Sequence, residues 1–224
     1  MDVTRRRELA RLALDGYPSG PGAPVRATAR ALAGVGDAAA VVLVEGVSDL
    51  IAVATAAGCL GRDLDAERVA VVPIGGAHAI GRFLADLGPL RPGVRLAGLC
   101  DLPEAGIVRR GLVAAGVGPP RARFDPAHPG FHVCAADLED ELIRAVGVDG
   151  VEELFAAQGD LGSFRSLQRQ PAWRGRETAE QMHRFLGSGS RRKLRYARLL
   201  VEAAARRGAL PRPLDALLAT VRPR

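Results

Sequence analysis

Four mostly apolar segments of strand length, each followed by a segment of helix length, constrain the fold of this 224-residue chain more than any other feature. They are AVVLVE (40–45), RVAVVPI (68–74), VRLAGLC (94–100) and FHVCAA (131–136). Runs without regular polar alternation are typical of strands buried on both faces, and the segments between them are long enough to connect parallel strands. The sequence therefore predicts an α/β fold in which helices flank a central parallel sheet.

The strand signal is confined to the middle of the chain. Residues 4–14 and 24–34 are predicted to form two short helices, separated by the Pro- and Gly-rich segment DGYPSGPGAP. From about residue 151 onward the pattern predicts only helices, interrupted by Pro and Gly. We therefore expect a helical N-terminal segment at 1–37, an α/β core at 38–150 and a helical C-terminal extension at 151–224.

The basic residues are concentrated in the C-terminal part. Residues 161–224 contain fifteen Arg or Lys and four Asp or Glu, a net charge of +11, whereas residues 1–160 carry a net charge of −5. Such a segment favours contact with a phosphate backbone, although a helical bundle with an arginine-rich exterior explains it too. The candidates for nucleic-acid contact are Arg165, Arg169, Arg174, Arg176, Arg191, Arg192, Arg195 and Arg198.

Membrane and secretion signals are missing from the sequence. No run reaches the roughly 18 apolar residues that a membrane span needs, and the N-terminal residues lack the apolar core of a secretory signal. Cys59, Cys100 and Cys134 lie far apart and form no CxxC pair, so three buried thiols are predicted. The only lysine, Lys193, stands in SRRKLR, which is no phosphate-binding loop of an ATPase. We expect a cytoplasmic protein without membrane contact.

Acidic residues follow three of the four predicted strands. Glu45 and Asp49 come at the end of the first, Asp101 ends the third, and ADLEDE (136–141) follows the fourth. Because the carboxyl ends of parallel strands share one edge of the sheet, these carboxylates should gather there, and a hard divalent cation is the usual means of keeping them ionised. Each also has a local explanation: Asp49 suits a helix N-terminus, and Asp137 or Asp140 suits a helix cap.

The remaining strand ends in PIGGAHAIGRF. There Gly75 and Gly76 suit a tight turn that brings backbone close to a ligand. Near the C-terminus, GSGSRR precedes a predicted helix, and Ser190 is a plausible N-cap beside N–H groups that suit a phosphate.

These motifs together resemble a known family. The E-G-x-x-D pattern of Glu45, Gly46 and Asp49, the Gly-Gly turn and the Asp that ends the third strand resemble a Toprim domain, the Mg²⁺-dependent fold of topoisomerases, bacterial primases, recombination mediators and OLD-family nucleases. VLVEGVSDL, PIGGAHAI, DLEDEL and RRKLRYARLL are similar to the Toprim half of the OLD (overcoming lysogenization defect) endonucleases. The resemblance covers roughly residues 38–205 and is to the stand-alone actinobacterial type, which lacks the ATPase domain.

The resemblance implies roles for individual residues. Glu45 and Asp49 would be metal ligands, with Glu45 also a candidate general acid or base. Asp101 would be the first acid of a DxD motif whose second position is occupied here by Pro103, while Glu104 stands one residue further on. Glu139 would be the later metal ligand, with Asp137 as a competing candidate, and Lys193 would be the catalytic lysine near the reacting phosphate.

The function implied by the resemblance is a nuclease that depends on Mg²⁺ or Mn²⁺ and hydrolyses phosphodiesters of DNA, with one or two ions bound. Two alternatives stay open: a catalytically degenerate Toprim protein that binds nucleic acid or a partner ATPase, and a primase-like nucleotidyl transferase. A topoisomerase is disfavoured, because the chain is too short to build a large gate around Tyr17 or Tyr196. A separate ATPase partner and a homo-oligomer are both compatible with the sequence.

Overall fold

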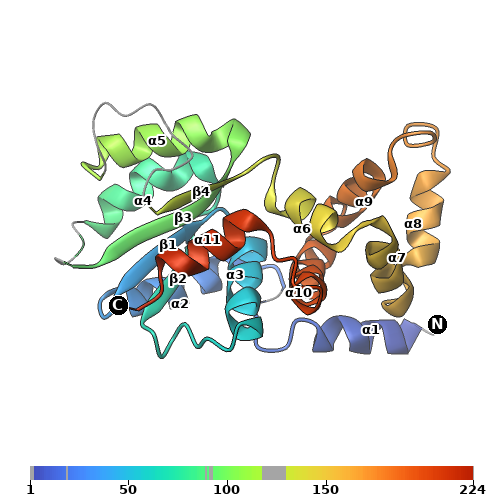
Figure 1. Cartoon of the computed structure of the whole chain (residues 1–224), viewed down its shortest axis with the longest axis horizontal. Coiled ribbons are helices and arrows are strands. Elements are labelled where there is room, and N and C mark those ends of the chain that lie inside the picture. Colours follow the sequence, from blue (N-terminus) through green and yellow to red (C-terminus); the bar gives the residue numbers. More distant parts are fainter. Residues whose placement is uncertain (1–2, 19, 89, 91–92, 118–129, 224) are drawn as a thin grey trace.

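A parallel sheet with flanking helices forms one half of the molecule, and a group of helices forms the other half (Figure 1). The fold is taken from a computed structural model, which describes residues 3–18, 20–88, 90, 93–117 and 130–223. Within these residues the sheet has four strands in the order β2-β1-β3-β4, all parallel to their neighbours. The strands are β1 (Ala40–Val44), β2 (Val69–Pro73), β3 (Arg95–Asp101) and β4 (Phe131–Cys134). Each lies within an apolar run identified in the sequence or overruns it by one residue, so the predicted α/β fold class is confirmed.

Helices connect and surround the strands. Those before and between the strands are α1 (Val3–Leu12), α2 (Ala23–Val35), α3 (Val47–Cys59), α4 (Ile80–Leu87) and α5 (Ala105–Ala114), with short 3₁₀ helices η1 (Ala77–Ala79) and η2 (Leu102–Glu104). Those after β4 are α6 (Leu138–Val146), α7 (Val148–Ala157), α8 (Leu161–Gln168), α9 (Thr178–Gly187), α10 (Ser190–Arg206) and α11 (Arg212–Thr220).

Both faces of the sheet are covered, as the uninterrupted apolar runs require. Successive side chains of a strand point to opposite faces. Val42 and Val44 of β1 therefore pack with α3, α6 and α11, whereas Val41 and Leu43 pack with α4 and α5. In β3, Gly98 leaves room for its neighbours, since a Cβ there would lie 2.6 Å from the Phe131 ring and 2.7 Å from the carbonyl oxygen of Leu43.

The C-terminal helices share the core of the sheet. One hydrophobic cluster runs from the sheet through α3 and α6 to the side chains of α7–α11. Within it four aromatic rings, those of Phe155, Phe164, Phe185 and Tyr196, pack with centroids 5.0–5.5 Å apart and join α7, α8, α9 and α10. The position of α10 against α3 and α6 is therefore fixed by core packing.

A buried carboxylate ties α1 to α10. Asp160, which is 4% exposed, forms ion pairs with Arg6 of α1 and with Arg195 of α10, and it accepts a hydrogen bond of 3.0 Å from the Tyr196 hydroxyl. The Arg195 side chain is itself buried. A buried ion pair needs both partners, because either charge alone is strongly destabilising in the interior.

We expect Asp160→Ala to lower the free energy of unfolding by about 3–5 kcal/mol, because it leaves the Arg195 guanidinium buried without a counter-charge. Urea unfolding followed by circular dichroism measures this. The control, Asp149→Ala, removes an exposed acid from the first turn of α7 and should cost less than about 1 kcal/mol. A loss for Asp160→Ala as small as the control's would contradict the structural role of this pair.

The burial of the three cysteine thiols differs from the sequence prediction at one position. Cys100 and Cys134 are buried, as predicted, but Cys59 is exposed, because it is the last residue of α3 and lies at the rim of the core. Among the residues that the structure describes, we find no helix with the length and apolar character needed to cross a membrane.

Candidate metal site at the carboxyl ends of the strands

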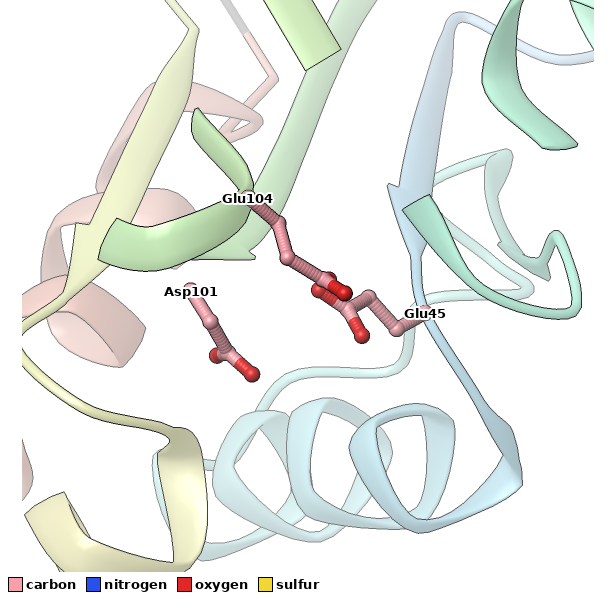
Figure 2. A group of neighbouring side chains, drawn as sticks. All are labelled: Glu45, Asp101 and Glu104. Atoms are coloured by element: carbon pink, nitrogen blue, oxygen red, sulfur yellow. The ribbon is translucent and has the colours of Figure 1, made fainter. Parts of the chain in front are cut away.

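Three carboxylates meet at the carboxyl edge of the sheet. Glu45 directly follows β1, Asp101 ends β3, and Glu104 ends η2. One carboxylate oxygen from each lies within 4.8 Å of the other two. Figure 2 shows the Glu45 and Glu104 carboxyl groups facing each other from opposite sides, with the Asp101 carboxyl group on the same side of the sheet edge. This is a donor set of hard oxygens, which Mg²⁺ and Mn²⁺ prefer.

The 3₁₀ helix η2 explains how Glu104 reaches the site although Pro103 occupies the usual acidic position. Pro103 lies in the first turn of η2, where its fixed φ angle is favourable and its missing N–H is not needed. A 3₁₀ helix has three residues per turn, so side chains three residues apart lie above one another. Glu104 is three residues after Asp101 and therefore projects on the same side.

Among the described residues, none of the three carboxylates forms an ion pair with a basic side chain. Burial is the main reason that the pKa of Glu45 is raised from 4.5 to about 9, followed by the hydrogen bond between its carboxyl group and that of Glu104 and by the charge of Asp101. Burial, followed by the charge of Asp49, raises the pKa of Asp101 from 3.8 to about 7. In the described part of the chain, no donor group hydrogen-bonds to the buried Oε1 of Glu45 or Oε2 of Glu104. These oxygens fit a divalent cation as the missing partner.

A second pair of acidic residues, Asp137 and Glu139, lies beside the first group, and each contacts a basic side chain. Lys193 of α10 forms an ion pair of 3.2 Å with the buried Glu139 of α6. Asp137, the N-cap of α6, accepts from the Asp140 N–H at 2.8 Å, and its other oxygen lies 2.5 Å from Nε2 of His183. The predicted capping role of Asp137 is thus confirmed.

Asp49 lies between the two groups. Its Oδ2 accepts a hydrogen bond of 2.9 Å from the N–H of Gly46, the N-cap of α3. This is only one of the two hydrogen bonds of a capping box, because glycine has no side chain to form the other. Burial and the charge of Glu139 raise the pKa of Asp49 from 3.8 to about 6, although the charge of Lys193 opposes this. The local explanation of Asp49 as a helix-terminal acid holds together with its place in the cluster.

His183 is a site residue that sequence reasoning missed. It lies in α9, and its hydrogen bond to Asp137 raises the pKa of the imidazole, against the opposing effect of burial. Burial raises the pKa of Asp137, but the hydrogen bonds from His183 and the Asp140 N–H lower it below its ordinary value. His183 stands in no motif, and only the packing of α9 against α6 brings it to the site.

The Gly75–Gly76 turn positions Glu45. The N–H groups of both glycines donate to the carbonyl oxygen of Glu45, each at 3.0 Å, and both residues have positive φ angles of 81° and 105° that favour glycine. These two N–H groups are used within the protein, and the approach of this backbone to a ligand stays a prediction. The turn holds the backbone of the first acidic residue.

The start of α10 also differs in detail from the prediction. Gly189, not Ser190, is the N-cap, and Ser190 is the first helical residue. No side chain caps this end of the helix. The reason is that Gly189 adopts the extended conformation that precedes the helix, while Ser190 already has helical geometry.

The arginines predicted to contact nucleic acid have different environments. Arg195 is buried against Asp160, so its assignment as a surface contact is wrong. Arg192 packs over the Phe185 ring and donates to the Phe185 carbonyl oxygen at 3.0 Å, and Arg198 pairs with Glu202. The remaining five are exposed, on α8, on the loop that follows it and at the start of α10: Arg165, Arg169, Arg174, Arg176 and Arg191.

The stability of the metal-free protein should fall as the pH rises between about pH 5 and about pH 9. Glu45 and Asp101 have folded-state pKa values near 9 and 7, above their ordinary values, so they favour folding when protonated, and this contribution is lost as they ionise. Thermal unfolding in EDTA across this range measures the effect. Saturating Mn²⁺ should flatten the decline, and the same decline with and without Mn²⁺ would contradict a metal site here.

Comparisons with known proteins agree with this architecture. Residues 38–102 match the sequence model of a family described as overcoming lysogenization defect protein-like, TOPRIM domain. The fold is similar to the C-terminal region of the OLD protein of Xanthomonas campestris pv. campestris (TM-score 0.55, 21% identity, 82% of this chain and 94% of that one). It is also similar to the C-terminal region of the Burkholderia pseudomallei OLD protein (TM-score 0.56, 18% identity, 82% and 97%). No curated protein sequence matches the chain.

The parallel sheet with acidic residues at its carboxyl edge is a Toprim fold. Residues 38–102 match the model of an OLD-like Toprim domain. The matched range includes Glu45, Asp49 and Asp101, whereas Glu104, Glu139 and Lys193 lie beyond it.

Proposed function

We propose that this protein is a divalent-metal-dependent nuclease that hydrolyses phosphodiester bonds of DNA. The observation that carries the proposal is the group of Glu45, Asp101 and Glu104, three half-buried carboxylates at one edge of the sheet that form no ion pair within the described part of the chain. The OLD-like Toprim domain supports a nuclease-type fold. Mg²⁺ or Mn²⁺ fits the oxygen donors, and Glu45, Asp101 and Glu104 would hold it.

The chemistry requires charge compensation. When bound, a divalent cation polarises a phosphoryl oxygen and lowers the pKa of a water molecule, which makes a nucleophile available near neutral pH. Glu45 would hold the cation as an ionised carboxylate; its raised pKa describes the metal-free site, where protonation takes the place of the cation, and a bound cation would lower it. Glu45 is also the candidate general acid or base.

Lys193 places a positively charged side chain next to the acidic site. Its ammonium group lies beside Glu139, and the charges of Glu139 and Asp49 raise its pKa, although burial opposes this. Lys193 is therefore charged at neutral pH and stabilises negative charge that develops on a phosphate bound at the edge of the sheet. His183 positions Asp137 through their hydrogen bond and thereby fixes the start of α6, which carries Glu139.

Incubation of the purified protein with plasmid and linear DNA in EDTA, Mg²⁺ or Mn²⁺ tests the proposal. We expect cleavage only with an added cation. Full binding of DNA without cleavage in any cation would favour the degenerate Toprim alternative instead. Extension of a primer or synthesis of one from nucleoside triphosphates would favour the nucleotidyl transferase alternative.

A further inference from the structure

A groove lies between α1 and the start of α10, outside the acidic site. It has a volume of about 970 Å³. Its charged lining consists of Arg7, Arg11, Arg191, Arg192, Arg195 and a single acid, Asp15. No motif in the N-terminal segment indicates a chemical role, yet α1 contributes two of these five arginines.

The groove is held in place from both sides. Asp160 pairs with Arg6 of α1 and with Arg195 at the base of the groove, and the Arg198 guanidinium donates to the Leu12 carbonyl oxygen at the end of α1 at 3.3 Å. Figure 1 shows α1 passing beside α10 at the edge of the helical part. The spacing between the two rows of arginines is therefore set by the fold.

Three of these arginines are exposed and unpaired within the described part of the chain. Arg7, Arg11 and Arg191 are exposed, and within the described residues they form no ion pair or side-chain hydrogen bond. Arg5, one residue before Arg6 on α1, is by contrast paired with Glu8 at 2.7 Å. Ser188, Gly189 and Ser190 line the same groove and leave the first turn of α10 without a side-chain cap. Arginine forks and open N–H groups both suit phosphate oxygens.

The first turn of α10 separates the groove from the acidic site. Arg191 and Arg192 line the groove, and the next residue, Lys193, pairs with Glu139 in the site. Consecutive residues of an α-helix are rotated by about 100° about its axis, so one turn presents arginines to one side and the lysine to the other. A polyanion in the groove is thereby brought next to carboxylates that would otherwise repel it.

We propose that the groove between α1 and α10 binds the phosphodiester backbone of a nucleic-acid strand and guides it to the acidic site. The proposal rests on the nuclease function for the identity of the ligand, because the groove is adjacent to Lys193. It assigns to α1 a part in substrate binding that the Toprim domain at 38–102 does not contain. Arg7 and Arg11 on α1 and Arg191 on α10 provide the contacts.

Point substitutions are required to test this, because α10 also carries Tyr196, Leu200 and Val201 of the core and cannot be deleted. The test variant is Arg7→Ala/Arg11→Ala. The matched control is Arg82→Ala/Arg110→Ala, which removes the same charge from exposed positions on α4 and α5, against the opposite face of the sheet. Neither pair lies in the core, so we expect an unchanged unfolding midpoint for both.

The measurement is fluorescence anisotropy with a labelled 20-nucleotide DNA strand and with its duplex, in EDTA, over a range of NaCl concentrations. The test variant should bind about tenfold more weakly. Its negative slope of log affinity against log salt should become shallower by about 1.5, since each lost phosphate contact reduces the magnitude of the slope by about 0.7–0.9. The control should change neither quantity. Test and control variants with the same affinity and slope would overturn the proposal.

Binding is measured in EDTA, which removes the divalent cation that cleavage requires. The result for the groove is therefore independent of the nuclease function. If the wild type cleaves no DNA in Mn²⁺ but the test variant loses binding and slope, the groove stands and the nuclease fails. If cleavage is present and the test variant binds like the control, the groove fails and the nuclease stands. Binding of the wild type to phosphatidylserine vesicles but not to DNA would overturn the proposal in favour of an anionic lipid surface.

Discussion

Glu45→Gln should lower metal-dependent DNA cleavage by at least about 10²–10³-fold and leave the fold intact. Glu45 is one of the three carboxylates that would hold the cation, and loss of that charge stabilisation costs several kcal/mol of barrier, where each 1.36 kcal/mol is a factor of ten. Initial rates on linear DNA in saturating Mn²⁺ measure the loss. Cleavage unchanged from the wild type would remove Glu45 from the catalytic assignment.

The same variant should be more stable than the wild type in EDTA above neutral pH. Burial, the Glu104 carboxyl group and Asp101 oppose ionisation of Glu45, so above neutral pH the metal-free wild type must take up a proton at Glu45 on folding or bury its charge. A neutral amide requires neither. Glu153→Gln is the matched control, because Glu153 is exposed on α7 and its side chain is 77% accessible. The control should change neither cleavage nor stability. A simultaneous loss of stability and activity in Glu45→Gln would indicate a folding defect instead.

The acidic residues at the strand ends could be predicted from sequence, because a strand and the residue that follows it are both visible in a short segment. Each strand is an apolar run, and acids that follow parallel strands must share an edge, so Glu45 and Asp101 could be placed together without coordinates. Glu104 could not be placed with the same certainty, because its direction depends on whether the chain after Asp101 turns as a 3₁₀ or an α-helix.

Contacts between distant helices account for most of what the sequence did not reveal. His183 reaches Asp137 only through the packing of α9 on α6. Arg195 was indistinguishable from its exposed neighbours in a basic segment, and its burial follows from Asp160, which lies 35 residues away. The role of Arg7 and Arg11 in a groove likewise depends on α1 packing beside α10, which no local pattern specifies.

The Gly75–Gly76 turn shows that a tight turn can be predicted from sequence while the partners of its N–H groups cannot. The sequence predicted a tight turn, and the positive φ angles of both residues confirm it. Which partner accepts from the two N–H groups is a question of register between β1 and β2, and the parallel pairing of Val44 with Pro73 places the Glu45 carbonyl oxygen there. A ligand-facing turn and an internal brace therefore look identical in sequence.

Glu104→Gln should lose one Mn²⁺-binding event and most of the cleavage activity, whereas Glu104→Asp should retain part of both. The reason is geometric: Glu104 Oε2 is buried, accepts from no donor group within the described residues and belongs to the same three-carboxylate group as Glu45 and Asp101. Asp keeps the charge but is shorter by one methylene group. Isothermal titration with Mn²⁺ gives the number of ions bound, and cleavage rates are measured on the same preparations.

The comparison of Glu104→Gln with the wild type decides whether Glu104 replaces the acid missing at Pro103. If it does, removal of its charge leaves Glu45 and Asp101 as two carboxylates for a cation that prefers six oxygen ligands, and both affinity and transition-state stabilisation fall together. Glu153→Gln again serves as the control and should titrate like the wild type. An equal number of ions in wild type and Glu104→Gln, with equal cleavage rates, would show that Pro103 has removed a ligand that Glu104 does not replace.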